Sequence, residues 1–188
     1  MEDARGRLFK PGGVFLPSRV TCFAALASPR TYLRQLRFWE QEMAGLVGAP
    51  YGDVTEILRS HSYVLDVEAE DCHSGWQVWH EMEFVEPTAE PEPQDIILEV
   101  TKPGRVHGVA LGFEATLSPR VTFRNNPWDL EVCWRQGLNP FLEPFELEVG
   151  DAALVQLVLP ASDLIQISFE MHALCGPAGA VKEAALAS

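Results

Sequence analysis

An alternation of apolar and polar residues with a period of two constrains the fold of this chain more than any other feature. Successive side chains of a β-strand point to opposite faces, so this period predicts strands with one buried face. Three long runs have it, and their predicted inward sets are Trp76, Val78, His80, Met82 and Phe84; Val109, Leu111, Phe113, Ala115 and Leu117; and Ile165, Ile167, Phe169, Met171 and Ala173.

Shorter strands are predicted between turn-forming residues. They lie near 13–16, 95–101, 130–137, 145–149 and 153–159, with turns at Pro103–Gly104, 125–127, Asn139–Pro140 and Gly150–Asp151. No crossover helices separate these strands, which favours antiparallel pairing. We therefore expect a mainly β fold that closes as an antiparallel barrel or sandwich, and we predict the β-barrel.

Two helices are predicted inside this β-rich chain, at about 28–60. Ser28 followed by Pro29 is typical of a helix N-cap and first helical position. Asp53 and Glu56 form a capping box for a second, shorter helix with Ile57 on its apolar face. Steps of three and four residues along the first helix place one apolar stripe on a single face: Leu33, Leu36, Trp39, Met43 and Leu46.

The net charge of −13 is concentrated in one stretch. Between Ser60 and Thr101 there are eleven acidic residues and no Lys or Arg. Such a surface repels phosphate backbones, so we expect no nucleic-acid partner, whereas a basic protein would be attracted. A solvated acidic face that only aids solubility is the other interpretation. No apolar run approaches the roughly 20 residues that span a bilayer, so no membrane association is expected.

The four cysteines are far apart in the sequence, and neither CxxC, HxH nor HExxH spacing occurs. No metal site is predicted, and nothing at the N-terminus resembles a signal peptide. We therefore expect a reduced, cytoplasmic protein.

Several short motifs resemble, in order and spacing, the C-terminal β-barrel of protein arginine N-methyltransferases. They are Leu8–Gly13, Phe38–Trp39, Val106–Gly108 followed by Phe113, Asn126–Trp128 leading to Cys133–Gln136, and Val149–Asp151. The resemblance extends from about Leu8 to about Leu174.

The resemblance also implies a domain organisation. Residues 1–17 would be a remnant of the junction with a nucleotide-binding domain, with Pro17 in the place of a cis-proline. Residues 18–175 would form the barrel, and the predicted helices at about 28–60 its dimerisation arm. Residues 176–188 would be a tail, either frayed or a short Ala-rich helix.

The parts of the family that carry the chemistry have no counterpart in this sequence. S-adenosylmethionine is normally held by a Gly-rich turn between a strand and a helix, with an acidic residue further on, and no glycine here has that context. The family's two-glutamate loop would precede Met1. No catalytic residue is therefore assigned, and we expect S-adenosylmethionine only where a partner chain supplies its site.

The segment around Cys133 and Trp134 resembles the family's substrate loop. Val132-Cys133-Trp134 occupies the place of a Thr-His-Trp signature, in which the tryptophan shapes the groove for the substrate arginine. Cysteine can neither donate hydrogen bonds from two ring nitrogens nor titrate near neutral pH as the histidine does. The resemblance assigns Cys133 and Trp134 to the groove, while the substitution argues against ordinary methyl-transfer geometry.

Three functions remain open, and none requires activity of this chain alone. The first is a noncatalytic module for protein binding and oligomerisation. The second is the barrel subunit of a split S-adenosylmethionine-dependent arginine methyltransferase, and the third is a fragment of a longer one. The expected partner is a protein, either a second copy or a separate methyltransferase chain. The predicted oligomer interface is the stripe Leu33, Leu36, Trp39 and Met43.

Overall fold

The computed structural model describes residues 10, 13–14, 16–47, 52–84, 93–125, 134–158 and 170–187. Its strands are β1 (Arg19–Ala27), β2 (Tyr63–Leu65), β3 (Gln77–Glu83), β4 (Gln94–Glu99), β5 (Gly104–Ser118), β6 (Val121–Arg124), β7 (Gln136–Leu147), β8 (Asp151–Val158) and β9 (Glu170–Pro177). Its helices are α2 (Arg30–Arg37), a π-helical segment (Phe38–Met43), α3 (Ala44–Val47), α4 (Gly52–Ser60), a 3₁₀ turn (Ala69–Asp71) and α5 (Ala178–Ala187).

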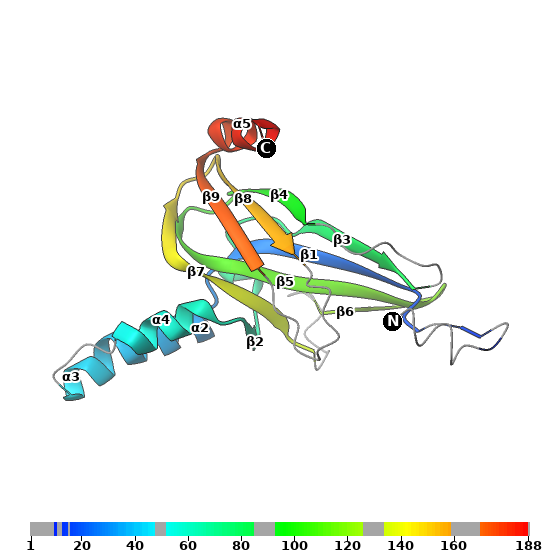
Figure 1. Cartoon of the computed structure of the whole chain (residues 1–188). Helices are drawn as coiled ribbons and strands as arrows, with labels where there is room; N and C mark the ends of the chain where they lie inside the picture. Colours follow the sequence, from blue (N-terminus) through cyan, green and yellow to red (C-terminus); the bar gives the residue numbers. More distant parts are fainter. Residues whose placement is uncertain are drawn as a thin grey trace.

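The described strands form two antiparallel sheets. The larger has the order β2-β7-β5-β1-β3, with β6 also paired to β5, and the smaller has the order β4-β8-β9. The predicted mainly β class with antiparallel strands is confirmed, and the described strands are divided between these two sheets. The smaller sheet lies over the larger, and the helices α2, α3 and α4 project from one end (Figure 1).

The main core fills the space between the two sheets. It contains Leu26 of β1, Val109 and Leu111 of β5, and Val155 and Leu157 of β8. The predicted inward set of β5 is confirmed, with Val109, Leu111 and Ala115 buried and Phe113 and Leu117 half-buried. Because the helical end of the molecule covers the other face, the intervening Ala110 is buried too.

A β-bulge changes the predicted inward set of β3. Cys22 pairs with His80 and Phe23 with Val78, which leaves Trp79 as the extra residue between them. A bulge of this kind reverses the alternation along the strand. Trp79 is therefore buried in the main core, whereas Val78, predicted to point inward, is 48% exposed.

The predicted turn at Asn139–Pro140 is wrong, because both residues lie inside β7. Pro140 sits opposite Gly108 of β5, next to an irregularity in the strand register. A Cβ atom on Gly108 would lie 2.4 Å from the Asn139 carbonyl oxygen and 2.8 Å from the Pro140 Cα atom. The strands approach this closely only because residue 108 has no side chain.

Other predicted features are confirmed. Gly104 and Gly150 have positive φ angles of 133° and 95°, as their predicted turns require. The Leu16–Pro17 peptide bond is cis, as the resemblance implies for Pro17. Of the two predictions for the tail, the helix is confirmed, with Val181 of α5 buried.

Some predictions are wrong or fall outside the described residues. Residues 13, 14 and 16, predicted as part of a strand, are not in one. Cys133, the side chain of Asp53 and the set Ile165, Ile167 and Phe169 lie outside the description, as do the side-chain environments of Met171 and Ala173. Among the described residues, none of the helices has the length and apolar character that a membrane crossing needs.

Candidate functional site

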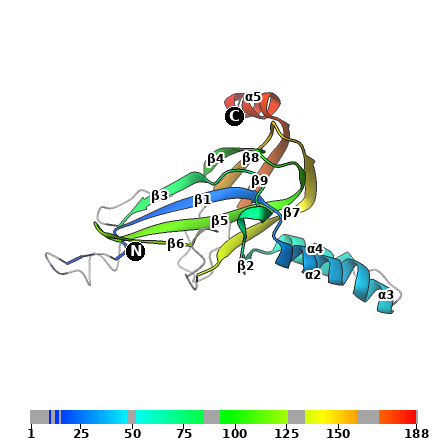
Figure 2. The ribbon, with the colours of Figure 1, turned by 180° about the vertical axis from the view of Figure 1, so that it is seen from behind.

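The helices α2, α3 and α4 and the π-helical segment are here called the arm, and the described part of the arm contacts the sheets at one end. The helices α2 and α4 run side by side and extend away from the sheets (Figure 2). Their anchored end packs on a second apolar cluster, here called the root cluster, which consists of Ala27, Tyr32, Leu36, Leu65, Val67, Ala110 and Leu138. The anchored end of the arm therefore shares an apolar core with the larger sheet.

Polar contacts also hold the root. The Tyr63 hydroxyl donates to the Leu58 carbonyl at 2.7 Å, and the Tyr63 ring lies 5.3 Å from that of Tyr32. Arg59 of α4 pairs with Glu40 at 2.9 Å and donates to a carbonyl of β7 at 3.3 Å. These contacts join both helices of the arm to each other and to the larger sheet.

The outer part of the arm presents apolar side chains to solvent. Leu46 is 79% exposed and Ile57 is 56% exposed, and Phe38 is also exposed. We call Phe38, Leu46 and Ile57 the outer arm surface. Single exposed apolar residues are common on protein surfaces, and these three lie on the part of the arm beyond the root cluster.

None of the four residues of the predicted interface stripe belongs to the outer arm surface. Leu36 is only 5% exposed and belongs to the root cluster, and Leu33 packs against that cluster. Trp39 and Met43 are half-buried. The stripe's helical period was sufficient to place all four residues on one face, but it could not reveal which part of that face the chain itself covers.

Ser28 does not cap α2, contrary to the sequence prediction. Its hydroxyl donates to the Arg105 carbonyl at 2.7 Å and lies 3.0 Å from Nδ1 of His107. The helix begins after Pro29, without a side-chain cap. Burial is the main cause that lowers the pKa of His107. Ser28 thus links the start of the arm to β5, a partner distant in sequence that local capping rules cannot identify.

Arg30 ties the first turn of α2 to the acid-rich stretch. It forms ion pairs with Glu68, with Glu70 at 3.5 Å and with Asp71 at 3.2 Å. The Asp71 carboxylate is buried and also accepts the Glu68 N–H at 3.0 Å. These contacts fix the 3₁₀ turn against the arm.

The acid-rich stretch is neutralised in part by cations from other segments. Besides Arg30, its partners are Arg19 with Glu81, Arg135 with Asp66, and Lys182 with Glu99. The acid-rich stretch is therefore neither purely solvated nor wholly available to a basic partner, because several of its carboxylates form ion pairs within the chain.

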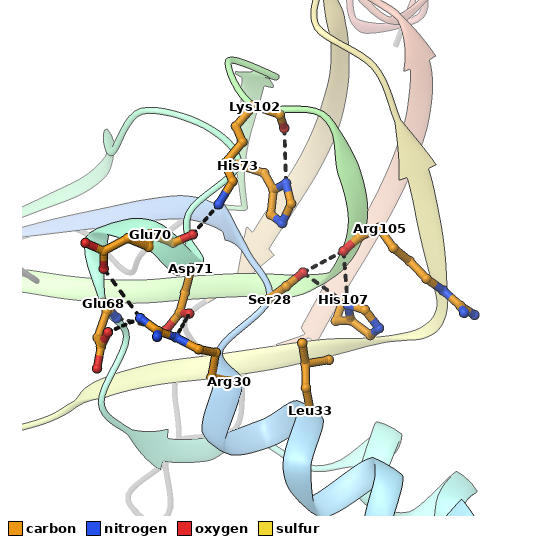
Figure 3. A pocket seen from close by; sticks show the side chains of 10 residues that line it. All are labelled: Ser28, Arg30, Leu33, Glu68, Glu70, Asp71, His73, Lys102, Arg105 and His107. Carbon is orange, nitrogen blue, oxygen red and sulfur yellow. Dashed lines mark hydrogen bonds and ion pairs between the residues drawn. The ribbon is translucent and has the colours of Figure 1, made fainter.

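A pocket of about 700 Å³ opens at the root, between the start of α2, the 3₁₀ turn and the start of β5 (Figure 3). Its lining includes Ser28, Arg30 and Leu33 from the arm side. His73 and His107 also line it. Sequence analysis did not identify this pocket, because its residues come from three separate segments, 28–33, 68–73 and 102–107.

Trp134 lies at the other candidate surface. Its side chain is 60% exposed, and its ring lies 5.7 Å from that of Phe113 and 5.8 Å from that of Phe123. Phe113 and Phe123 are themselves 5.8 Å apart. Trp134 meets both phenylalanine rings edge-to-face, which is favourable at these distances, so the three rings form one aromatic surface.

Two buried carboxamides hold the ends of the segment that carries Trp134. Asn125 accepts the Phe113 N–H at 2.7 Å and donates to the Arg135 carbonyl at 2.8 Å. Gln136 donates to the Asn125 carbonyl and accepts the Val67 N–H at 3.1 Å. We call this pair the amide bracket. The resemblance matched Gln136 but gave it no role.

The described residues offer neither a metal site nor a reactive thiol. No group of three or more His, Cys, Asp or Glu residues there could hold a metal ion. Cys22, Cys72 and Cys175 are free, and burial raises the pKa of each to about 11, so all three are protonated thiols at neutral pH.

The described strands also do not fit S-adenosylmethionine. A nucleotide-type site uses a parallel strand followed by a Gly-rich turn and a helix. Every strand pair in the described part of the chain is antiparallel. No residue there is assigned to this cofactor.

Comparison with known proteins gives one curated relative and a group of solved structures. No family model matches the chain. An arginine N(omega)-methyltransferase of Streptomyces achromogenes subsp. streptozoticus is 26% identical over 162 residues, which are 84% of this chain and 43% of that protein. The chain therefore spans less than half the length of this relative.

Two solved structures have the same fold over most of this chain. Protein arginine methyltransferase 10 of Arabidopsis thaliana matches with a TM-score of 0.69 and 18% identity, over 93% of this chain and 60% of its own. The PRMT1 enzyme–prozyme heterotetrameric complex of Trypanosoma brucei, with AdoHcy, matches with a TM-score of 0.70 and 16% identity, over 92% of this chain and 60% of the matched chain. The two sheets and their projecting arm thus have the fold of part of a protein arginine methyltransferase.

Proposed function

We propose that this chain is a noncatalytic protein-binding and oligomerisation module that resembles the barrel domain of protein arginine N-methyltransferases. The observation that carries the proposal is the outer arm surface, where Phe38, Leu46 and Ile57 are exposed on an element anchored only at its root. We propose residues 18–175 as the domain, with the arm at about 28–60.

The exposed side chains of the outer arm surface give an energetic reason for association. Complete burial of one large apolar side chain contributes about 1.5–3 kcal/mol. Covering these three side chains could therefore supply several kcal/mol toward association, before the entropy cost of binding is subtracted. We propose a second copy of the chain as the first candidate partner, with Trp39 and Met43 at the margin of the contact.

Sedimentation equilibrium of the purified chain tests this proposal. We expect a concentration-dependent mass above that of the monomer, which Leu46→Glu and Ile57→Glu should reduce to the monomer mass. Leu174→Glu is the matched control, because Leu174 is also exposed, at 50%, but lies on β9 away from the arm. A monomer at every concentration, or equal effects of the three variants, would contradict self-association through the arm.

A separate methyltransferase chain is the second candidate partner. Val14 and Leu16, just before the cis Pro17, are 78% and 66% exposed, which supports a further contact at this end of the chain. The matched Trypanosoma brucei structure is an enzyme–prozyme complex, so assembly from unlike chains occurs with this fold. In such a split enzyme the partner would hold S-adenosylmethionine, and this chain would contribute the groove at Cys133 and Trp134.

Co-purification combined with photolabelling tests the split enzyme. The tagged chain is captured from its native source, and the captured complex is irradiated with radiolabelled S-adenosylmethionine. We expect a labelled partner chain, and methyl transfer that requires both chains. A labelled partner whose activity is unchanged when this chain is removed would rule out a contribution of this chain to catalysis.

A further inference from the structure

We propose that two copies of this chain pair through antiparallel arms, with the Arg34 side chain of each copy against the Glu42 side chain of the other. This pairing rests on the proposed self-association of the chain, and it specifies the orientation and register of the contact. It uses one exposed line of side chains along the arm, here called the seam, which consists of Arg34, Phe38, Glu42 and Leu46.

The π-helical segment keeps the seam straight. The segments α2, Phe38–Met43 and α3 follow one another without a break. A step of four residues along an α-helix passes a full turn by about 40°, so three such steps would rotate the line by about 120°. A π-helix has wider turns, because its hydrogen bonds join residues five apart, and there four residues fall short of a turn. The two deviations oppose each other, and all four seam residues are exposed, as one outward line requires.

The two charged residues of the seam have no ion-pair partner in the described part of the chain. Glu40, which lies between them in the sequence, pairs with Arg59 at 2.9 Å. Arg34 and Glu42, by contrast, form no ion pair within the described ranges. An available cation and an available anion therefore lie four residues before and four residues after the exposed Phe38.

This order of charges matches a two-fold axis at Phe38. In an antiparallel pair centred there, Arg34 of each copy lies opposite Glu42 of the other, and the two Phe38 rings meet between the ion pairs. A parallel pair would instead place Arg34 opposite Arg34 and Glu42 opposite Glu42, and such like-charge contacts are unfavourable. A two-fold axis makes both ends of the contact identical, so one surface is sufficient on each copy.

The position of Phe38 also fits the length of the arm. The helical stretch from Arg30 to Val47 has its midpoint between Phe38 and Trp39. Two arms that pair about this point overlap along the whole stretch, which is about 27 Å long at 1.5 Å per residue. The outer end of each arm then reaches the root of the other arm. Leu46, which is 79% exposed in one copy, would be covered there.

The apolar and charged residues of the seam have different roles in this contact. Phe38 and Leu46 belong to the outer arm surface, and their burial supplies the attraction. Exposed ion pairs add little affinity, but like charges placed opposite each other suppress the wrong arrangement. Arg34 and Glu42 therefore select the antiparallel orientation.

Sedimentation equilibrium of charge-reversal variants tests the seam. Arg34→Glu sets like charges opposite each other at both ends of the contact, and we expect it to weaken self-association about tenfold or more. The double variant Arg34→Glu/Glu42→Arg exchanges the two charges and should restore the affinity of the parent. Arg120→Glu is the matched control, because it changes the net charge equally. Arg120 is exposed in the turn between β5 and β6, at the end of the larger sheet remote from the arm (Figure 1).

A mixing experiment separates antiparallel from parallel pairing. Tagged parent should retain untagged parent but not the untagged double variant Arg34→Glu/Glu42→Arg, because a mixed antiparallel pair has like charges at both ends. In a parallel pair the same mixture would have opposite charges at both ends. Preferential retention of the double variant by the parent would therefore overturn the antiparallel orientation.

The outcomes distinguish the seam from self-association itself. A parent that stays monomeric at every concentration would contradict both proposals. Association that Leu46→Glu abolishes but Arg34→Glu leaves unchanged would overturn the seam alone, as would equal weakening by Arg34→Glu and Arg120→Glu. A loss with Arg34→Glu that the double variant does not reverse would show that the arm packs on another surface of the second copy, and it would also overturn the seam.

Discussion

The arm carries apolar side chains along its whole length, but its root and its outer part use them differently. At the root, Tyr32 and Leu36 are buried against residues of β1, β5 and β7. Further out, Leu46 and Ile57 are exposed. The arm thus buries apolar side chains at its root and exposes them further out.

The largest expected difference between the two regions concerns stability. Leu36→Ala should lower the free energy of unfolding by about 2–5 kcal/mol, because it leaves a cavity in the root cluster. Urea denaturation monitored by circular dichroism measures this change. A loss below about 1 kcal/mol would mean that the root cluster collapses around the cavity or is not a packed core.

The surface at Trp134 provides a second comparison of exposed and buried residues, because the exposed Trp134 lies beside the buried side chains of the amide bracket. Gln136→Leu should cost about 1–3 kcal/mol, since it leaves the Asn125 carbonyl and the Val67 N–H without partners. Gln35→Leu, at an exposed position of α2, is the control and should change stability by less than about 0.5 kcal/mol. Equal urea midpoints for the two variants would show that the amide bracket is not stabilising.

One pH-dependent contribution to stability should come from the root. Burial keeps the pKa of His107 below its ordinary value, so the unfolded chain binds a proton more readily than the folded chain. The contribution of His107 to stability is complete above about pH 6.5 and is lost as the pH falls toward its folded pKa. His107→Asn should make the urea midpoint less dependent on pH between about 7.5 and 5. Parallel pH profiles for the variant and the parent would contradict this.

The smallest expected effect is at the outer arm surface. Leu46→Ala should change the free energy of unfolding by less than about 0.5 kcal/mol, because the side chain contacts mainly solvent. The same variant should weaken any self-association measured by sedimentation. A stability loss as large as that of Leu36→Ala would remove the distinction between root and outer arm.

Elements with a local cause could be predicted from the sequence. The inward set Val109, Leu111 and Ala115 follows from the pleat of one strand, and the conformations of Gly104 and Gly150 follow from their turns. The first helix of the arm was predicted from its period and the second from Asp53 and Glu56 as a capping box, and both signals are also local. In each case the signal and its structural consequence lie within a few residues of each other.

Features that depend on a distant partner could not be predicted. Ser28 has the sequence context of a cap, but the Arg105 carbonyl competes for its hydroxyl. Pro140 has the context of a turn, but Gly108 on the neighbouring strand allows it to remain in β7. The bulge at Trp79 has no local signal at all. The pocket and the amide bracket belong to this class, because each joins segments that meet only after folding.

The ion pairs of the acid-rich stretch have a consequence for the unfolded chain. Glu68, Glu81 and Glu99 find their cations 38, 62 and 83 residues away, and no Lys or Arg lies within the stretch itself. Before folding, this stretch therefore repels itself and remains extended. It contains β3, which forms an edge of the larger sheet. The repulsion discourages that edge from pairing with another unfolded copy, and only the native topology supplies the cations that remove it.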